Sequence, residues 1–133
     1  MVLRATRPVG AAVGVLAATL ALRLRDPHVT GSWGFCPLRA LTGLDCPFCG
    51  GLRAVNDLSR LRLSDAVHSN ALLVGLVPVL LAGWTWWAWR SWRCRPVRAP
   101  SGRRARLLWW LAAAVALAFT VFRNTAWGSA YWA

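Results

Sequence analysis

Three of the four cysteines in this chain lie in one short segment, CPLRALTGLDCPFCGG, which covers residues 36–51. They are Cys36, Cys46 and Cys49, and their C-x9-C-x2-C spacing permits several chemistries. A disulfide from Cys36 to either of the other two would close a short loop and stabilise the fold by about 3 kcal/mol. Such a bond forms in oxidising compartments and would leave one thiol over.

Metal binding is the second chemistry that this segment permits. The C-x2-C pair of Cys46 and Cys49 lets two thiolates hold one ion, and Cys36 could supply a third ligand. His68 or His28 would then complete a tetrahedral set. This donor set suits zinc, although the sequence commits the protein to no cofactor.

Thiol redox chemistry is the third. A C-x-x-C pair at the start of a helix can hold a thiolate of lowered pKa, because unpaired backbone N–H groups face it. Arg53 would add positive potential and Cys36 could act as a resolving thiol. Three unlinked, packed thiols are the fourth reading, and the spacing alone leaves all four open.

Few other residues favour catalysis. Arg53 is expected to brace the loop or contact lipid, Asn70 to cap a helix or bond another backbone, and His68 to lie at the membrane interface. Asp57 and Asp65 are expected on a solvated face or in salt bridges. The sequence shows no Ser/His/Asp order, no phosphate-binding glycine loop and no carboxylate pair within a span, so it leans away from an enzyme.

The elements that must position the cysteines are apolar. The chain is 57% hydrophobic, and long apolar stretches occupy residues of about 8–24, 71–89 and 107–122. These lengths and the tryptophans near their ends predict three transmembrane helices. We therefore predict one all-α integral membrane domain over residues 1–133, in which Pro78 kinks the second span.

The loop between the first two spans, residues 25–70, is expected to hold short interfacial helices. Leu52, Val55, Leu58 and Leu61 recur at a spacing typical of an amphipathic helix. Ser64, with Asp65, is the expected N-cap of a second helix that runs into the second span.

The distribution of arginines predicts the orientation of the chain in the membrane. The net charge of +12 could indicate nucleic acid, but the arginines lie between apolar runs, as in a membrane protein. Residues 90–106 contain seven arginines and no acid, so this loop is expected in the cytoplasm. The N-terminus then lies inside, and the cysteine loop lies outside. A cleaved first segment would leave the cysteine loop outside as well.

The order C-P-x4-T-G-x2-C-P-x-C-G-x2-R-A, followed by an Asn at the start of a proline-bearing span, resembles a bacterial membrane family catalogued as domain of unknown function 2752. The further matching positions are Thr42, Gly43, Pro47, Gly50, Arg53 and Asn70. Leu52 and Ala71 depart from the family pattern, which usually has Thr and Pro there. The resemblance implies a helical membrane protein with no established activity.

Taken together, the sequence predicts a small module of the bacterial cytoplasmic membrane. The module would lie in the lipid bilayer and present a disulfide- or metal-stabilised outer loop to a membrane-protein partner or to a second copy of the chain. It would catalyse no reaction and bind no nucleic acid. The alternative is a thiol-redox or metal-handling membrane protein that uses the three loop cysteines.

Overall fold

The computed structural model describes residues 2–95 and 100–132, and within these ranges every regular element is a helix. The predicted all-α class is therefore confirmed. The helices are α1 (Val2–Leu24), α2 (Pro37–Thr42), α3 (Gly51–Ser59), α4 (Leu63–Trp92), α5 (Gly102–Arg123) and α6 (Ala126–Trp132).

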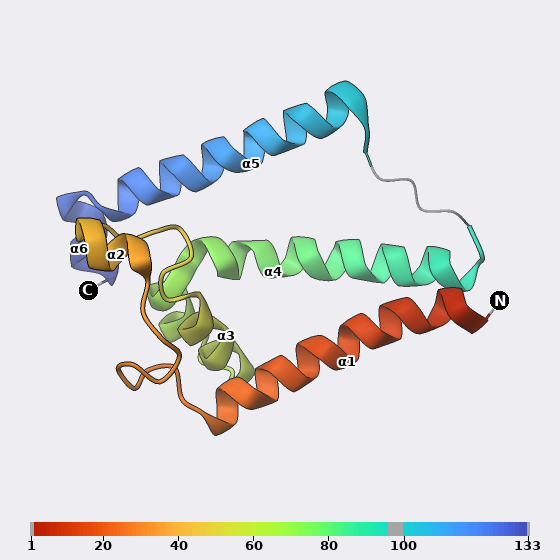
Figure 1. The fold of residues 1–133 in the computed structure, drawn as a ribbon, viewed down its shortest axis with the longest axis horizontal. Helices are drawn as coiled ribbons and strands as arrows, with labels where there is room; N and C mark the ends of the chain where they lie inside the picture. The colour runs from red at the N-terminus through yellow and green to blue at the C-terminus, as the bar shows by residue number, and fades with distance from the viewer. Residues whose placement is uncertain (1, 96–99, 133) are drawn as a thin grey trace.

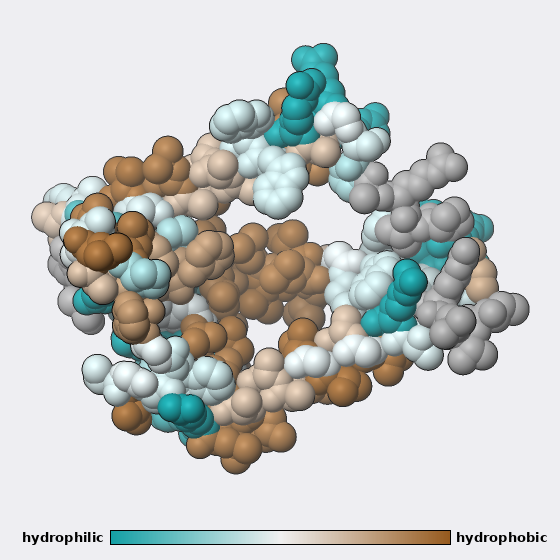
Figure 2. All heavy atoms as spheres, in the orientation of Figure 1, coloured by the Kyte–Doolittle hydropathy of each residue, from teal (hydrophilic) through white to brown (hydrophobic). Residues whose placement is uncertain are grey.

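Three of these helices are long and apolar enough to cross a membrane, over Thr6–Leu24, Leu63–Trp92 and Gly102–Arg123. Their axes are roughly aligned in Figure 1, with successive helices running in opposite directions, and α2, α3 and α6 gather at one end of them. The apolar surface lies mostly along the middle of the molecule, with much of the hydrophilic surface towards the two ends (Figure 2). This distribution fits a multi-pass membrane protein whose surroundings are lipid.

The first long helix is fastened to the rest of the chain near both ends. Near its start, the indole Nε1 of Trp84 in α4 donates to the carbonyl oxygen of Pro8 at 3.2 Å. At its end, the side-chain amide of Asn56 in α3 donates to the carbonyl oxygen of Leu22 at 2.7 Å. The last carbonyls of a helix have no partner within it, so Asn56 satisfies one of the groups that α1 leaves open. Asn56 is fully buried.

The second long helix is broken at Asn70, the one position within α4 whose backbone angles are not helical (φ −164°, ψ 93°). The backbone at Pro78 remains helical, so the break lies nearer the start of the helix than the predicted kink. The expected N-cap at Ser64 is wrong, because α4 begins at Leu63 with Arg62 as its N-cap residue. The Ser64 hydroxyl instead donates to Asp65 at 3.3 Å.

The third long helix, α5, is the least embedded in the protein. Arg123, its last residue, is its only buried one. The helix contacts α6, which in turn contacts α4. Large apolar side chains along it, such as Trp109 (77% exposed) and Leu117 (66%), are open to the surroundings. Hydrocarbon or another helix must therefore cover α5 in a membrane.

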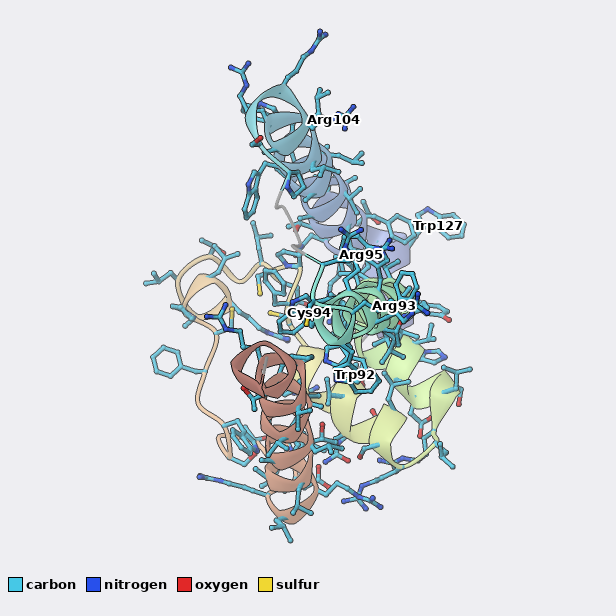
Figure 3. The ribbon with its side chains drawn as sticks, turned by 90° about the vertical axis from the view of Figure 1, so that its right-hand side faces the viewer. Trp92, Arg93, Cys94, Arg95, Arg104 and Trp127 are labelled. Carbon is cyan, nitrogen blue, oxygen red and sulfur yellow. The ribbon has the colours of Figure 1, made fainter. Side chains whose placement is uncertain are left out.

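The opposite end of the molecule, seen face-on in Figure 3, brings arginines to the end of α4 and the start of α5. Arg93, Cys94 and Arg95 follow Trp92, and Arg104 lies in the first turn of α5. This end belongs to the predicted cytoplasmic loop, of which residues 96–99 lie outside the described residues. Cys94 is thus far along α4 from the other three cysteines.

Replacing Asn70 with Leu should destabilise the protein, because Asn70 is 1% exposed and makes three hydrogen bonds through its side chain. We expect the free energy of unfolding to fall by roughly 2 to 4 kcal/mol, since the variant leaves buried backbone groups unpaired. A lower thermal unfolding midpoint in detergent micelles would show this. Ser64→Ala, at an exposed site, is the control, and equal midpoints for the two variants would contradict the assignment.

Candidate functional site

The three cysteines of the loop lie together at the end of the molecule where α2, α3 and α6 gather. The Sγ atoms of Cys46 and Cys49 are 3.2 Å apart, and those of Cys36 and Cys46 are 3.7 Å apart. All three sulfur atoms lie within 4.8 Å of one another, and each residue is half-buried. The four cysteines of the chain are free thiols in this structure.

Cys36 occupies the N-cap of α2, and Pro37 takes the first helical position. The backbone N–H of Arg39, in the open first turn of α2, is the largest influence that lowers the pKa of the Cys36 thiol. The helix ends at Gly43 in the left-handed conformation (φ 72°), where its N–H donates to the Arg39 carbonyl. The Thr42 hydroxyl donates to the carbonyl of Leu38 at 2.7 Å. The Thr-Gly pair of the motif thus ends the helix that Cys36 begins.

Cys46 and Cys49 are held by a tight turn through Pro47. The N–H of Cys49 donates to the carbonyl of Cys46 at 3.1 Å, and the N–H of Cys46 points at the Cys49 sulfur at 3.3 Å. Gly50 follows with φ 76°, and a Cβ there would collide with the carbonyl oxygen of Ser69. Glycine is therefore required at this position, both for the backbone angle and for the close approach of α4.

Burial is the largest influence on Cys49, and it raises the pKa of this thiol to about 12. The neighbouring Cys46 side chain acts in the same direction. The pKa of Cys36 is therefore lower than that of an ordinary thiol, and the pKa of Cys49 is higher, although the two side chains belong to one cluster. At neutral pH, Cys36 is the more readily ionised of these two, and Cys49 remains a thiol unless a metal or another cation displaces its proton.

The side chain of Asn70 connects this turn to the second span. Its amide donates to the carbonyl oxygens of Pro47 at 2.9 Å and of Cys49 at 3.1 Å. Its side-chain oxygen accepts from the N–H of Leu73 at 2.9 Å, which caps the helix that continues after the break. Asn70 therefore does both of the things expected of it, because it caps one segment and bonds the backbone of another.

Sequence reasoning missed a second connection, which ties the cysteine loop to the end of α5. Asp45, the residue before Cys46, pairs with Arg123 (Nε–Oδ2, 3.4 Å) and with Arg39 (2.9 Å). The Asn124 side chain accepts from the N–H of Asp45 and donates to its carbonyl, both at 2.9 Å. The signal in the sequence was the polar pair Arg123 and Asn124, which directly follows the third apolar stretch.

The predicted histidine ligands lie elsewhere. The ring of His68 stacks on Tyr131 (centroids 4.5 Å apart, planes at 14°), and its Nδ1 lies 3.2 Å from the Tyr131 carbonyl oxygen. His28 lies between two carboxylates, at 2.8 Å from Asp26 and 3.3 Å from Asp57. Neither histidine belongs to the group formed by the three sulfurs. His68 as a metal ligand stays a prediction that requires its ring to leave Tyr131.

Arg53 and Asp57 lie on one face of α3, which turns towards the start of α4. Asp57 was expected in a salt bridge or on a solvated face; it is fully buried, paired with Arg62 at 2.6 Å and bonded by the Ser69 hydroxyl at 3.1 Å. Arg53 is exposed and lines a polar cavity that Asp57 also lines. The motif arginine is thus beside the cysteine loop without contributing to the sulfur group.

The fold and the site define a class: a helical protein with three helices apolar enough to span a membrane and a cluster of three thiols at one end of them. Residues 36–84 match the model of a family described as a protein of unknown function (DUF2752). The resemblance expected from the cysteine segment is thereby confirmed. No curated protein and no solved structure matches the chain.

The lowered pKa of Cys36 predicts its alkylation behaviour. A lowered pKa means that the reactive thiolate persists as the pH falls, until the pH passes the lowered value, whereas the raised pKa of Cys49 keeps that residue protonated up to strongly alkaline pH. We expect Cys36 to react with a small haloacetamide at a pH where Cys49 does not. Site-resolved mass spectrometry of the reduced protein across a pH series measures both rates. Equal pH profiles for the two cysteines would contradict the assignment.

Proposed function

We propose that this protein is a small, non-enzymatic module of the bacterial cytoplasmic membrane, whose loop binds a soft metal ion through Cys36, Cys46 and Cys49. The observation on which this rests is the convergence of three sulfur atoms within 4.8 Å of one another. Tetrahedral zinc with Zn–S bonds of about 2.3 Å places its sulfurs roughly 3.8 Å apart. Two of the three separations, 3.7 Å and 3.2 Å, are close to that value, and the third is no more than 4.8 Å.

The surroundings of the thiols support the binding of a metal by thiolates. Cys36 already has a lowered pKa, and its sulfur faces the first turn of α2. Arg39 and Arg123 bring positive charge close to the loop through Asp45. A metal ion would offset the burial that keeps Cys49 protonated, since a coordinated thiol loses its proton. Metal binding should consequently release protons.

Three protein ligands leave one position open on a tetrahedral ion. Structural zinc sites use four protein ligands, whereas a site with three keeps a place for water or an incoming group. We infer that a side chain of a membrane-protein partner or of a second copy of this chain can complete the set. This accounts for a loop that is well ordered by Asn70 and Arg123 yet has half-buried sulfurs.

We further propose that the thiol site faces outward and that the N-terminus is cytoplasmic. The support is the arginine-rich stretch between α4 and α5, because short loops with many arginines are retained in the cytoplasm. Cys94 lies in that stretch, next to Arg93 and Arg95 (Figure 3), and would be reached only from the inside. An outward site would receive its metal from the periplasmic or extracellular side.

The metal proposal predicts a stoichiometry. Purified full-length protein reconstituted with zinc, and separately with copper(I) under reducing conditions, should hold about one ion per chain of at least one of the two metals. In Cys46→Ser the bound metal should fall to background, because Cys46 is within 3.7 Å of both other sulfurs. Inductively coupled plasma mass spectrometry after desalting measures the ratio.

Cys94→Ser is the matched control, since Cys94 is exposed and lies outside the sulfur group. It should bind metal as the wild type does. Absence of either metal from the wild type, or equal metal in the wild type and in Cys46→Ser, would end the metal proposal.

The lowered pKa of Cys36 and the nearby sulfur of Cys46 favour a second candidate, thiol–disulfide exchange with a protein disulfide of a partner. The Cys36 thiolate would attack one partner sulfur, forming a mixed disulfide and releasing the other partner sulfur as a thiolate. Cys46, 3.7 Å away, would then lose its proton and attack Cys36. The partner leaves with two thiols and this chain keeps a Cys36–Cys46 disulfide.

The exchange candidate predicts a trapped intermediate. Cys46→Ser lacks the resolving thiol, and the raised pKa of Cys49 keeps that residue protonated, so a mixed disulfide through Cys36 should accumulate in membranes and disappear on reduction. Non-reducing electrophoresis of acid-quenched membranes would reveal it. A Cys36→Ser/Cys46→Ser double variant is the control. If Cys46→Ser forms no more adduct than this control, the exchange candidate fails.

A further inference from the structure

A polar cavity of about 530 Å³ lies at the same end of the molecule as the thiols. Its walls come from the segment after α1, from α3, from the first turns of α4 and from the end of α5. The lining residues are all charged or polar: Asp26, His28, Arg53, Asp57, Arg62, Asp65, His68, Ser69 and Arg123. The volume falls within the usual range for small-ligand sites, although such sites are commonly apolar.

One wall of the cavity is a chain of polar and charged side chains that contact one another. His28 connects Asp26 to Asp57, and Arg62 connects Asp57 to Asp65 at 2.6 Å and 3.6 Å. Asp57, at its centre, is fully buried and its two oxygens are occupied by Arg62, Ser69 and His28. The side chains of Asp26 and Asp65 are 43% and 55% exposed, so these two carboxylates can meet a ligand.

Arg53 supplies a positive charge to the cavity, opposite in sign to the two exposed carboxylates. It is exposed, lines the cavity, and lies one turn before Asp57 on the same face of α3. None of the ion pairs among the described residues includes Arg53. The cavity therefore offers a guanidinium that can bind an anion, and two exposed carboxylates that can bind a cation.

The lining as a whole carries no excess of formal charge, because three arginines face three aspartates when the histidines are neutral. A simple anion would be repelled by Asp26 and Asp65, and a simple cation by Arg53. A ligand that carries both a negative and a positive charge can pair with the Arg53 guanidinium and with an exposed carboxylate. The backbone N–H of His28 lowers the pKa of Asp26, which keeps that carboxylate ionised.

The location of the cavity indicates where such a ligand comes from. The residues that line it stand just after α1, in the first turns of α4 and at the last residue of α5, which are the ends of all three helices able to span a membrane. In a bilayer these ends lie at the depth of the lipid headgroups. The most abundant molecules at that depth are phospholipids, and those with an ammonium group next to the phosphate carry both signs.

We propose that this cavity binds the headgroup of a zwitterionic phospholipid that bears a primary amine. Arg53 receives the phosphate, and the exposed carboxylate of Asp65 receives the ammonium group. The proposed headgroup contacts are distinct from the proposed metal ligands, although Arg123 lines the cavity and also pairs with Asp45 of the cysteine loop.

Native mass spectrometry of the full-length protein in detergent tests the proposal. Phosphatidylethanolamine and anionic phosphatidylglycerol of identical acyl chains are added separately. The wild type should retain phosphatidylethanolamine in preference. In Arg53→Gln its binding should weaken about tenfold, because a charge-assisted contact to phosphate is lost. Asp65→Asn should reduce the preference over phosphatidylglycerol, since it removes a carboxylate that favours an ammonium group.

Arg25→Gln is the matched control, because Arg25 is an exposed arginine near the cavity that does not line it, and its lipid binding should equal that of the wild type. A melting curve shows whether Arg53→Gln is folded. Equal retention of both lipids by the wild type, or unchanged binding in a folded Arg53→Gln, would overturn the proposal. Free phosphoethanolamine binding as tightly as the lipid would overturn the lipid assignment in favour of a soluble ligand.

Discussion

The arrangement of the thiols depends on the side chain of Asn70. It lies at a break in α4, and its buried amide is shared between the carbonyls of Pro47 and Cys49 and the N–H of Leu73. The break leaves the N–H of Leu73 without its helical partner, and the side-chain oxygen of Asn70 accepts from it, while the amide nitrogen donates to two carbonyls of the cysteine loop. Because Gly50 has no Cβ, the turn that holds Cys46 and Cys49 can lie directly against Ser69. The second span thereby fixes the position of two of the three sulfurs.

The end of the molecule that holds the thiols is further stabilised by the ion pairs and hydrogen bonds of two aspartates, Asp57 and Asp45. Asp57 pairs with Arg62 and His28 and accepts a hydrogen bond from the Ser69 hydroxyl. Asp45 pairs with Arg123 and Arg39. Each aspartate thus has several partners, which is how a buried carboxylate offsets the loss of water. The same groups separate two neighbouring sites, because Arg123 contacts the cysteine loop on one side and lines the polar cavity on the other.

The helical class could be predicted from apolar run length, and the match of residues 36–84 to a family model from the register of the cysteines and prolines. The roles of Asn70 were also expected in kind, because a polar amide at the start of a span must bond backbone. Proximity of Cys36 to the other two sulfurs could not be derived, since it depends on how α2 folds back. The burial of Asp57 was missed because aspartate is usually solvated, and Ser64 failed as an N-cap because Arg62 precedes the first helical turn. Long-range contacts such as Asp45 to Arg123 leave no periodic signal in a sequence.

The isolation of α5 has a mechanical consequence. This helix is bonded to Asp45 through Arg123 and Asn124 and contacts α6, while Arg123 is its only buried residue. A change in the tilt of α5 would therefore move the two side chains that bond to the residue before Cys46.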